Sequence, residues 1–158
     1  MTSSISKTLK KYALRFQDWV LGNMTAEECV FCKIVRGELP SWKIVENDSA
    51  LGILNTNPTA EGHCLIIPKR HVRYWHDLSD AETAVVFNTA KTVAQKIKKV
   101  FKPDFVCVFI RGGRVRHAHI VLFPSQEGDR LSGFPQSVLG IAKINFDDVR
   151  MKLVSVEL

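Results

Sequence analysis

The sequence predicts an α+β fold in which five antiparallel strands form one sheet and a single long helix packs against it. Three short strand-like segments lie between residues 42 and 68. One long amphipathic pattern follows at residues 79–101, and two further strand-like segments occupy residues 105–124. Strands, then one helix, then strands again are typical of an α+β domain with an antiparallel sheet.

The first three strands are separated by turn-forming residues. The segments WKIVE (42–46) and ALGILN (50–55) flank Asn47-Asp48-Ser49, so we expect them to pair as a hairpin. The turn-rich loop TNPTAEG (56–62) then leads to CLIIP (64–68), which is short and almost wholly apolar. Three strands in sequence therefore precede the helix.

The long helix is predicted from its start, its periodicity and its end. Ser79 and Glu82 have the spacing of a capping box, and Pro103 prevents continuation. Apolar side chains recur between them at helical spacing: Val86, Ala90, Val93, Ile97 and Val100. The strand FVCVFI (105–110) follows, and a tight turn joins it to the strand RHAHIVLFP (116–124).

Three regions are expected: an N-terminal extension (1–24), a folded domain (25–128) and a C-terminal extension (129–158). Residues 4–21 carry one apolar stripe at helical spacing, which predicts an amphipathic helix docked on the body. A membrane-surface or organelle-targeting segment is the alternative, because Lys, Arg and Ser outnumber a single acid there. The closing residues MKLVSVEL (151–158) fit an added edge strand.

Composition restricts the class of protein and its partners. The 158 residues fit one domain, and no apolar run is long enough to span a membrane. The net charge of +6 favours an anionic partner such as a nucleotide, a nucleic acid or an acidic membrane surface. No secretory signal pattern is present, so the cytoplasm is the expected location. There the C-x-x-C of Cys29 and Cys32 favours metal or redox chemistry over a disulfide.

Two histidines at the start of the last strand point to phosphate chemistry. Alternate side chains of a strand share a face, so His117 and His119 are expected to point the same way. The preceding Gly112-Gly113 turn offers backbone N–H groups that can surround a phosphate, and arginines at 111, 114 and 116 add positive charge.

Three motifs in order resemble those of the histidine-triad nucleotide-binding family. VRHAHIVLFP (115–124) is similar to its signature of alternating histidines and apolar residues. CVFCKIVRGELPSWKIVEND (29–48) resembles the N-terminal segment and first hairpin, and LNTNPTAEGHCLIIPKRH (54–71) resembles the ribose-binding loop and the following strand. The resemblance implies the histidine-triad fold, a purine nucleotide or nucleotide derivative as ligand, and a homodimer that joins two sheets.

The resemblance also implies roles for individual residues. His119 matches the nucleophile that attacks the α-phosphorus, and a neutral imidazole suits this role near pH 7. His63 matches a further catalytic histidine near the phosphate, and Asn55 the residue that holds the ribose hydroxyls. The remaining nucleotide-binding positions are the apolar walls around the base and the phosphate loop: Phe31, Ile34, Ile53, Gly112, Gly113 and Arg114.

A structural zinc ion is a further implication of the resemblance. Cys29, Cys32, His71 and His117 match a ligand set of two thiolates and two imidazoles, which suits tetrahedral zinc. One alternative is that the cysteines are only reduced thiols and that His117 supports the active site by hydrogen bonding. Another replaces His117 with His76, as in a zinc finger, although 38 residues lie between Cys32 and His71.

The sequence departs from the family signature at Val121, where active relatives have a polar residue that contacts the phosphate. Loss of one such group can cost about two to three orders of magnitude in rate. Two functions therefore remain: a nucleotidyl hydrolase or transferase using His119, which retention of His119 favours, and a nucleotide-binding protein with little turnover, which Val121 favours. An RNA-binding accessory protein is a third, less favoured reading of the positive charge.

Overall fold

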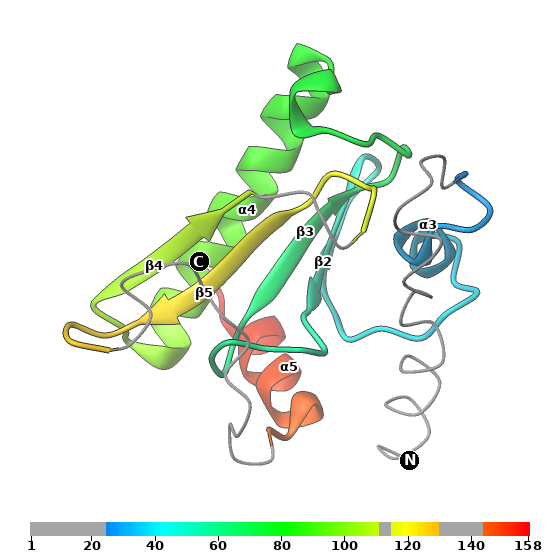
Figure 1. The fold of residues 1–158 in the computed structure, drawn as a ribbon. Coiled ribbons are helices and arrows are strands. Elements are labelled where there is room, and N and C mark those ends of the chain that lie inside the picture. Colours follow the sequence, from blue (N-terminus) through cyan, green and yellow to red (C-terminus); the bar gives the residue numbers. More distant parts are fainter. Residues whose placement is uncertain (1–24, 111–114, 130–143) are drawn as a thin grey trace.

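The computed structural model describes residues 25–110, 115–129 and 144–158 (Figure 1). Five strands form one antiparallel sheet in the order β1-β2-β3-β5-β4. The predicted α+β class, with five antiparallel strands and one long helix, is confirmed. The elements in chain order are α3 (Val30–Val35), β1 (Lys43–Glu46), β2 (Ala50–Leu54), β3 (Cys64–Pro68), the 3₁₀ helix η1 (Trp75–Asp77), α4 (Asp80–Phe101), β4 (Phe105–Phe109), β5 (Ile120–Ser125) and α5 (Phe146–Ser155).

The long helix α4 begins at the predicted capping box. The Ser79 hydroxyl accepts the backbone N–H of Glu82, and the Glu82 carboxylate accepts the backbone N–H of Ser79. Arg70, just after β3, also contacts this carboxylate, with 2.6 Å between Arg70 Nε and Glu82 Oε1. At the other end Lys102 adopts a left-handed backbone (φ 49°), and Pro103 follows. The start of the helix is therefore fixed to the end of β3.

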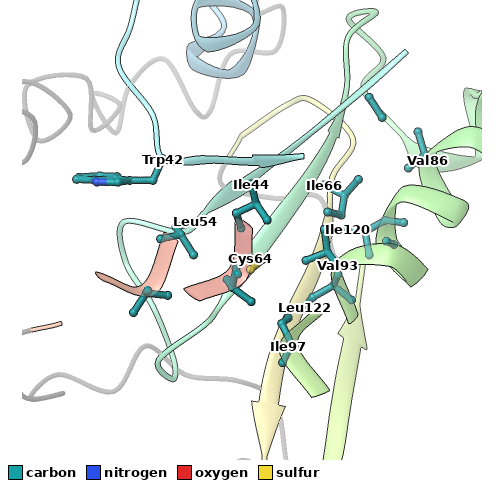
Figure 2. Packing of buried hydrophobic residues seen from close by; sticks show 14 residues of the cluster. Trp42, Ile44, Leu54, Cys64, Ile66, Val86, Val93, Ile97, Ile120 and Leu122 are labelled. Atoms are coloured by element: carbon teal, nitrogen blue, oxygen red, sulfur yellow. The ribbon is translucent and has the colours of Figure 1, made fainter. Parts of the chain in front are cut away.

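Alternating side chains of the sheet form two apolar layers. On one face Ile66, Ile120 and Leu122 pack under α4 and α5, and Figure 2 shows this core between strands and helices. On the other face Leu65 and Ile67 pack against α3. Figure 1 places α3 beside the β2 and β3 side of the sheet, away from α4. The segment that contains both cysteines of the C-x-x-C motif therefore lies on the face that α4 leaves open.

Two expectations for the chain after residue 115 are wrong. Residues 151–155 belong to helix α5 and do not form an edge strand, because Asn145 caps the helix and Val149 and Leu153 are buried in the α4 core. The last strand starts at Ile120, so both histidines precede it. The backbone there leaves the sheet, since the N–H of residue 118 donates to the carbonyl of residue 72 at 2.6 Å.

The predicted N-terminal helix lies outside the described residues, as do Gly112, Gly113 and Arg114 of the predicted phosphate loop. Among the helices of the described part of the chain, none is long and apolar enough to cross a membrane. The extent of the folded domain at 25–128 remains a prediction, although α5 contributes to the main core.

Candidate active site and metal centre

Four side chains from three separate segments form a group that could hold a metal ion. Cys29 and Cys32 come from the start of α3, His71 follows β3, and His117 precedes β5. One ligand atom from each lies within 4.8 Å of all the others. Cys29 Sγ and Cys32 Sγ are each 3.4 Å from His117 Nδ1, and Cys32 Sγ is 3.1 Å from His71 Nδ1. The fold therefore brings these four predicted ligands together.

The hydrogen bonding of His117 suits a bound cation. His117 is fully buried, and its Nε2–H donates to the carbonyl oxygen of Pro68 at 2.9 Å, so the lone pair of Nδ1 faces the two sulfur atoms. Such an outer hydrogen bond orients many metal-binding histidines. Burial and the neighbouring Cys29 raise the pKa of the Cys32 thiol. A bound cation has the opposite effect and stabilises the thiolate.

The alternative ligand His76 does not belong to this group. Its ring is exposed, stacks on Tyr74, and lies 4.0 Å from the carboxylate of Asp77. The zinc-finger interpretation, which required His76 in place of His117, is therefore not supported by the fold.

His119 has the hydrogen bonding of a neutral imidazole with one nitrogen held in place. Its Nδ1–H donates to the carbonyl oxygen of His117 at 2.8 Å. Its ring is half-buried and meets the ring of Phe31 edge-on, with 5.2 Å between centroids. Burial lowers the pKa of His119, and the bond to the carbonyl partly opposes this shift. The ring is therefore neutral near pH 7, with the lone pair on Nε2.

His63 and Asn55 form a second polar group at the end of β2 and the start of β3. The Thr59 N–H donates to His63 Nδ1, and His63 Nε2 lies 2.9 Å from Asn55 Nδ2. Gly62 fixes this loop: its φ is +85°, and a Cβ there would lie 2.5 Å from Phe101. Burial, with a smaller contribution from His119, lowers the pKa of His63 to about 4.

The free energy of unfolding should therefore depend on pH through His63. The unfolded chain binds a proton at this residue below about pH 6.5, whereas the folded protein binds it only below about pH 4. Stability is thus lost as the pH falls from 6.5 to 4 and changes little below that range, by roughly 3 kcal/mol in all. Urea unfolding at a series of pH values, compared between wild type and His63→Asn, measures the difference. The amide oxygen of the variant retains an acceptor for the Thr59 N–H. If the free energy of unfolding depended on pH equally in both proteins, the lowered pKa of His63 would be contradicted.

The apolar residues predicted as walls of the base site lie on the α3 face of the sheet. Phe31 contacts the rings of both His117 and His119, whereas Ile34 and Ile53 are buried in the same apolar cluster. Val121 in β5 packs against this cluster from its edge and is partly exposed. It therefore presents only methyl groups two residues after the His119 ring.

A cavity of about 130 Å³ adjoins His119. Most of its walls were not predicted as site residues, because the sequence gives no local pattern that links residues 73–76 with residue 119. Residues 73–76 come close to residue 119 in the tertiary structure, where the segment after β3 hydrogen-bonds to the segment before β5. Its described lining residues are Arg73, Tyr74, Trp75, His76, Ile110, Ala118 and His119.

The fold and the paired histidines are those of a histidine-triad (HIT) domain. Comparison with known proteins gives the same family. The model of the HIT domain family matches residues 36–128, more than half of the chain. This protein therefore belongs to the HIT (histidine-triad) family.

Two named relatives are about one third identical to this chain over the aligned residues. Adenosine 5′-monophosphoramidase hnt1 of Schizosaccharomyces pombe is 35% identical over 114 residues, which is 68% of this chain and 83% of the relative. Adenylylsulfatase HINT3 of Arabidopsis thaliana is 36% identical over 109 residues, 66% of this chain and 55% of the relative. This chain thus matches little more than half of the plant protein's length.

A solved structure has the same fold. The zinc-bound histidine-triad family protein from Mycobacterium smegmatis superposes with a TM-score of 0.71 and 27% identity, covering 83% of this chain and 94% of that one.

Proposed function

We propose that this protein is a nucleotidyl hydrolase or transferase in which His119 attacks the α-phosphorus of a purine nucleoside phosphate derivative. The hydrogen bond from His119 Nδ1 to the His117 carbonyl supports this role, because it leaves Nε2 as the nucleophilic nitrogen. The names of two relatives, an adenosine 5′-monophosphoramidase and an adenylylsulfatase, support an adenosine nucleotide as substrate.

The reaction with a phosphoramidate proceeds in two displacements. His119 Nε2 forms a bond to phosphorus while the phosphorus–nitrogen bond breaks, and the amine leaves with that electron pair and takes a proton from solvent. The imidazole keeps its Nδ1–H, so the intermediate carries a positive ring that the His117 carbonyl stabilises. Water then attacks phosphorus, the bond to Nε2 breaks, and the nucleoside monophosphate leaves with release of one proton. A different acceptor in place of water makes the reaction a transfer.

The other predicted site residues bind the nucleotide in this proposal. Asn55, beside His63, contacts the ribose hydroxyls, and His63 assists near the phosphate. At pH 7 His63 is neutral, because the pKa of its buried ring is about 4, so it acts by hydrogen bonding and not as a cation. The base lies near Phe31, Ile34 and Ile53. The phosphate is bound by the backbone N–H groups of Gly112 and Gly113 and by the positive charge of Arg114.

We also propose that Cys29, Cys32, His71 and His117 bind a structural zinc ion. Tetrahedral zinc with nitrogen at about 2.0–2.1 Å and sulfur at about 2.3 Å places these atoms about 3.6 Å apart. Three sulfur–nitrogen distances, of 3.1 and 3.4 Å, come close to this value, and all four ligand atoms lie within 4.8 Å of one another. The ion would supply a fixed link between α3 and the segment that carries the nucleophile. A zinc-bound relative of the same fold supports this proposal.

The second candidate function, nucleotide binding with little turnover, is favoured by Val121. A valine side chain neither donates to the phosphate nor protonates the departing group. Because the nucleophile and its hydrogen bond are retained, we favour slow catalysis over none.

Replacing Val121 with histidine should therefore raise kcat. The expected increase is about a hundredfold, the size of effect found for one donor directed at transition-state charge. Release of AMP from adenosine 5′-monophosphoramidate measures it. The matched control is Val121→Leu, which stays apolar and should give no gain; equal rates for the two variants would mean that the missing polar group does not limit turnover.

The proposal as a whole is tested by incubating the intact protein with adenosine 5′-monophosphoramidate and measuring AMP and ammonia. Release of AMP and ammonia faster than in buffer alone supports the enzymatic function. Tight binding of AMP without such release would leave the binding function alone.

A dimer and a cytoplasmic location complete the proposal. Strand β4 lies at an edge of the sheet, and a second copy of the chain could pair its backbone along this edge. In this proposal the reducing cytoplasm keeps the thiols of Cys29 and Cys32 available to the metal ion.

A further inference from the structure

Four consecutive residues between β3 and α4, all aromatic or basic, lie beside His119. This segment of the β3–α4 connection (Figure 1) forms one side of the cavity next to the nucleophile. We call it the aromatic wall; it consists of Arg73, Tyr74, Trp75 and His76.

The side chains of the aromatic wall are arranged against one another. The rings of Tyr74 and His76 are nearly parallel, with 5° between their planes and 5.3 Å between centroids. The Arg73 guanidinium lies 4.8 Å from the Tyr74 centroid, and the Trp75 ring stands edge-on to His76 at 6.0 Å. Tyr74 is nevertheless 43% exposed and Trp75 46% exposed. These two rings are therefore largely exposed, contribute little to the core, and are available to a ligand.

Such a surface has the chemistry to bind another flat ring. Aromatic faces stack on planar ligands, and a guanidinium both stacks on rings and attracts negative charge. Arg73 is the permanent cation of the wall, because a guanidinium group stays protonated at any physiological pH. A cavity of about 150 Å³ is known to admit benzene, and the volume here is about 130 Å³. The open side of the cavity adds room, so the site fits one aromatic ring.

The cavity is distinct from the residues assigned to the nucleoside. Its described lining residues include none of Phe31, Asn55 and His63. Phe31 instead contacts His119 directly, through its ring edge. His119 therefore adjoins both the cavity and the nucleoside site. The leaving group on the phosphorus can occupy the cavity while the nucleoside occupies its own site.

We propose that the aromatic wall binds an aromatic ring carried by the leaving group of the nucleotide substrate. The inference rests on the proposed function, in which His119 attacks the α-phosphorus, and it names the substrate class: nucleoside phosphate derivatives with an aryl-bearing leaving group. Trp75 and Arg73 are specificity residues for that group.

Two substrates with the same nucleoside test this proposal. One is adenosine 5′-monophosphoramidate, which releases ammonia, and the other is the anilide of AMP, which releases aniline. Wild type should favour the anilide, and Trp75→Ala should lower the ratio of the two kcat/KM values about tenfold, as expected for loss of one stacking ring. Trp75→Phe should restore most of the ratio. Phe87→Ala, which removes an exposed aromatic ring on α4, is the matched control and should leave the ratio unchanged.

The remaining outcomes overturn the proposal. An unchanged ratio in Trp75→Ala would mean that the wall does not contact the leaving group. If the ratio of the two kcat/KM values depended on the base of the nucleotide and not on Trp75, the cavity would be assigned to the base. If wild type releases AMP from neither compound, the proposed function fails. Equilibrium binding then still decides the subsite, since the anilide of AMP must bind wild type more tightly than Trp75→Ala, with AMP binding to both as the reference.

Discussion

Substitution of His119 by alanine should lower the release of AMP by about a thousandfold or more, to near the rate in buffer. No other described side chain combines the required features: a neutral imidazole, a second nitrogen held by a carbonyl oxygen, and a place on the wall of a cavity. Removing a nucleophile leaves only the rate that binding and orientation provide. The measurement is AMP release under single-turnover conditions, with wild type and variant in parallel.

The matched readouts separate loss of chemistry from loss of structure. His119→Ala should keep its affinity for AMP in equilibrium dialysis, because Asn55 and Phe31 remain in place. Wild type quenched during turnover should carry one nucleotidyl group, detected by intact-protein mass, and the variant should carry none. Added imidazole should restore part of the rate by occupying the vacated space. An unchanged rate in the variant would place the nucleophile elsewhere.

The fold was predictable because its signals are local. The capping residues Ser79 and Glu82 sit where the sequence places them, and the first three strands occupy the predicted segments. Helix α5 was missed because its β-branched residues resemble a strand. Burial of Val149 and Leu153 against α4 outweighs that propensity, and burial depends on contacts that one segment does not contain.

The candidate site was predictable only in part. Resemblance to known motifs selected Cys29, Cys32, His71 and His117, and the fold brings them together from distant segments. The aromatic wall was missed, because it comes to lie beside His119 only in the tertiary structure, where the backbone N–H of residue 118 donates to the carbonyl of residue 72. Composition and periodicity carry no signal for such a contact. The two histidines, by contrast, were found from their spacing in the sequence.

Substitution of Cys32 by serine should abolish stoichiometric zinc binding and lower the free energy of unfolding. The wild-type chain should retain one zinc ion after dialysis against metal-free buffer, and Cys32→Ser should retain close to none, since Cys32 Sγ contacts both imidazoles of the group. A ligand that binds only the folded state at a thousand times its Kd stabilises that state by about 4 kcal/mol. We therefore expect a loss of about this size, measured by urea unfolding in the presence of zinc, and a similar loss when a chelator strips the wild-type protein.

Cys107→Ser is the matched control for the metal centre. Cys107 lies in the edge strand β4, is partly exposed, and does not belong to the ligand group. This variant should bind one zinc ion and unfold as wild type does, so thiol loss alone would not mimic the Cys32 result. Equal metal content in Cys32→Ser and Cys107→Ser, or a wild-type protein whose stability ignores chelation, would contradict a structural zinc ion. The buried thiols and His117 would then hold α3 to the nucleophile segment by hydrogen bonds alone.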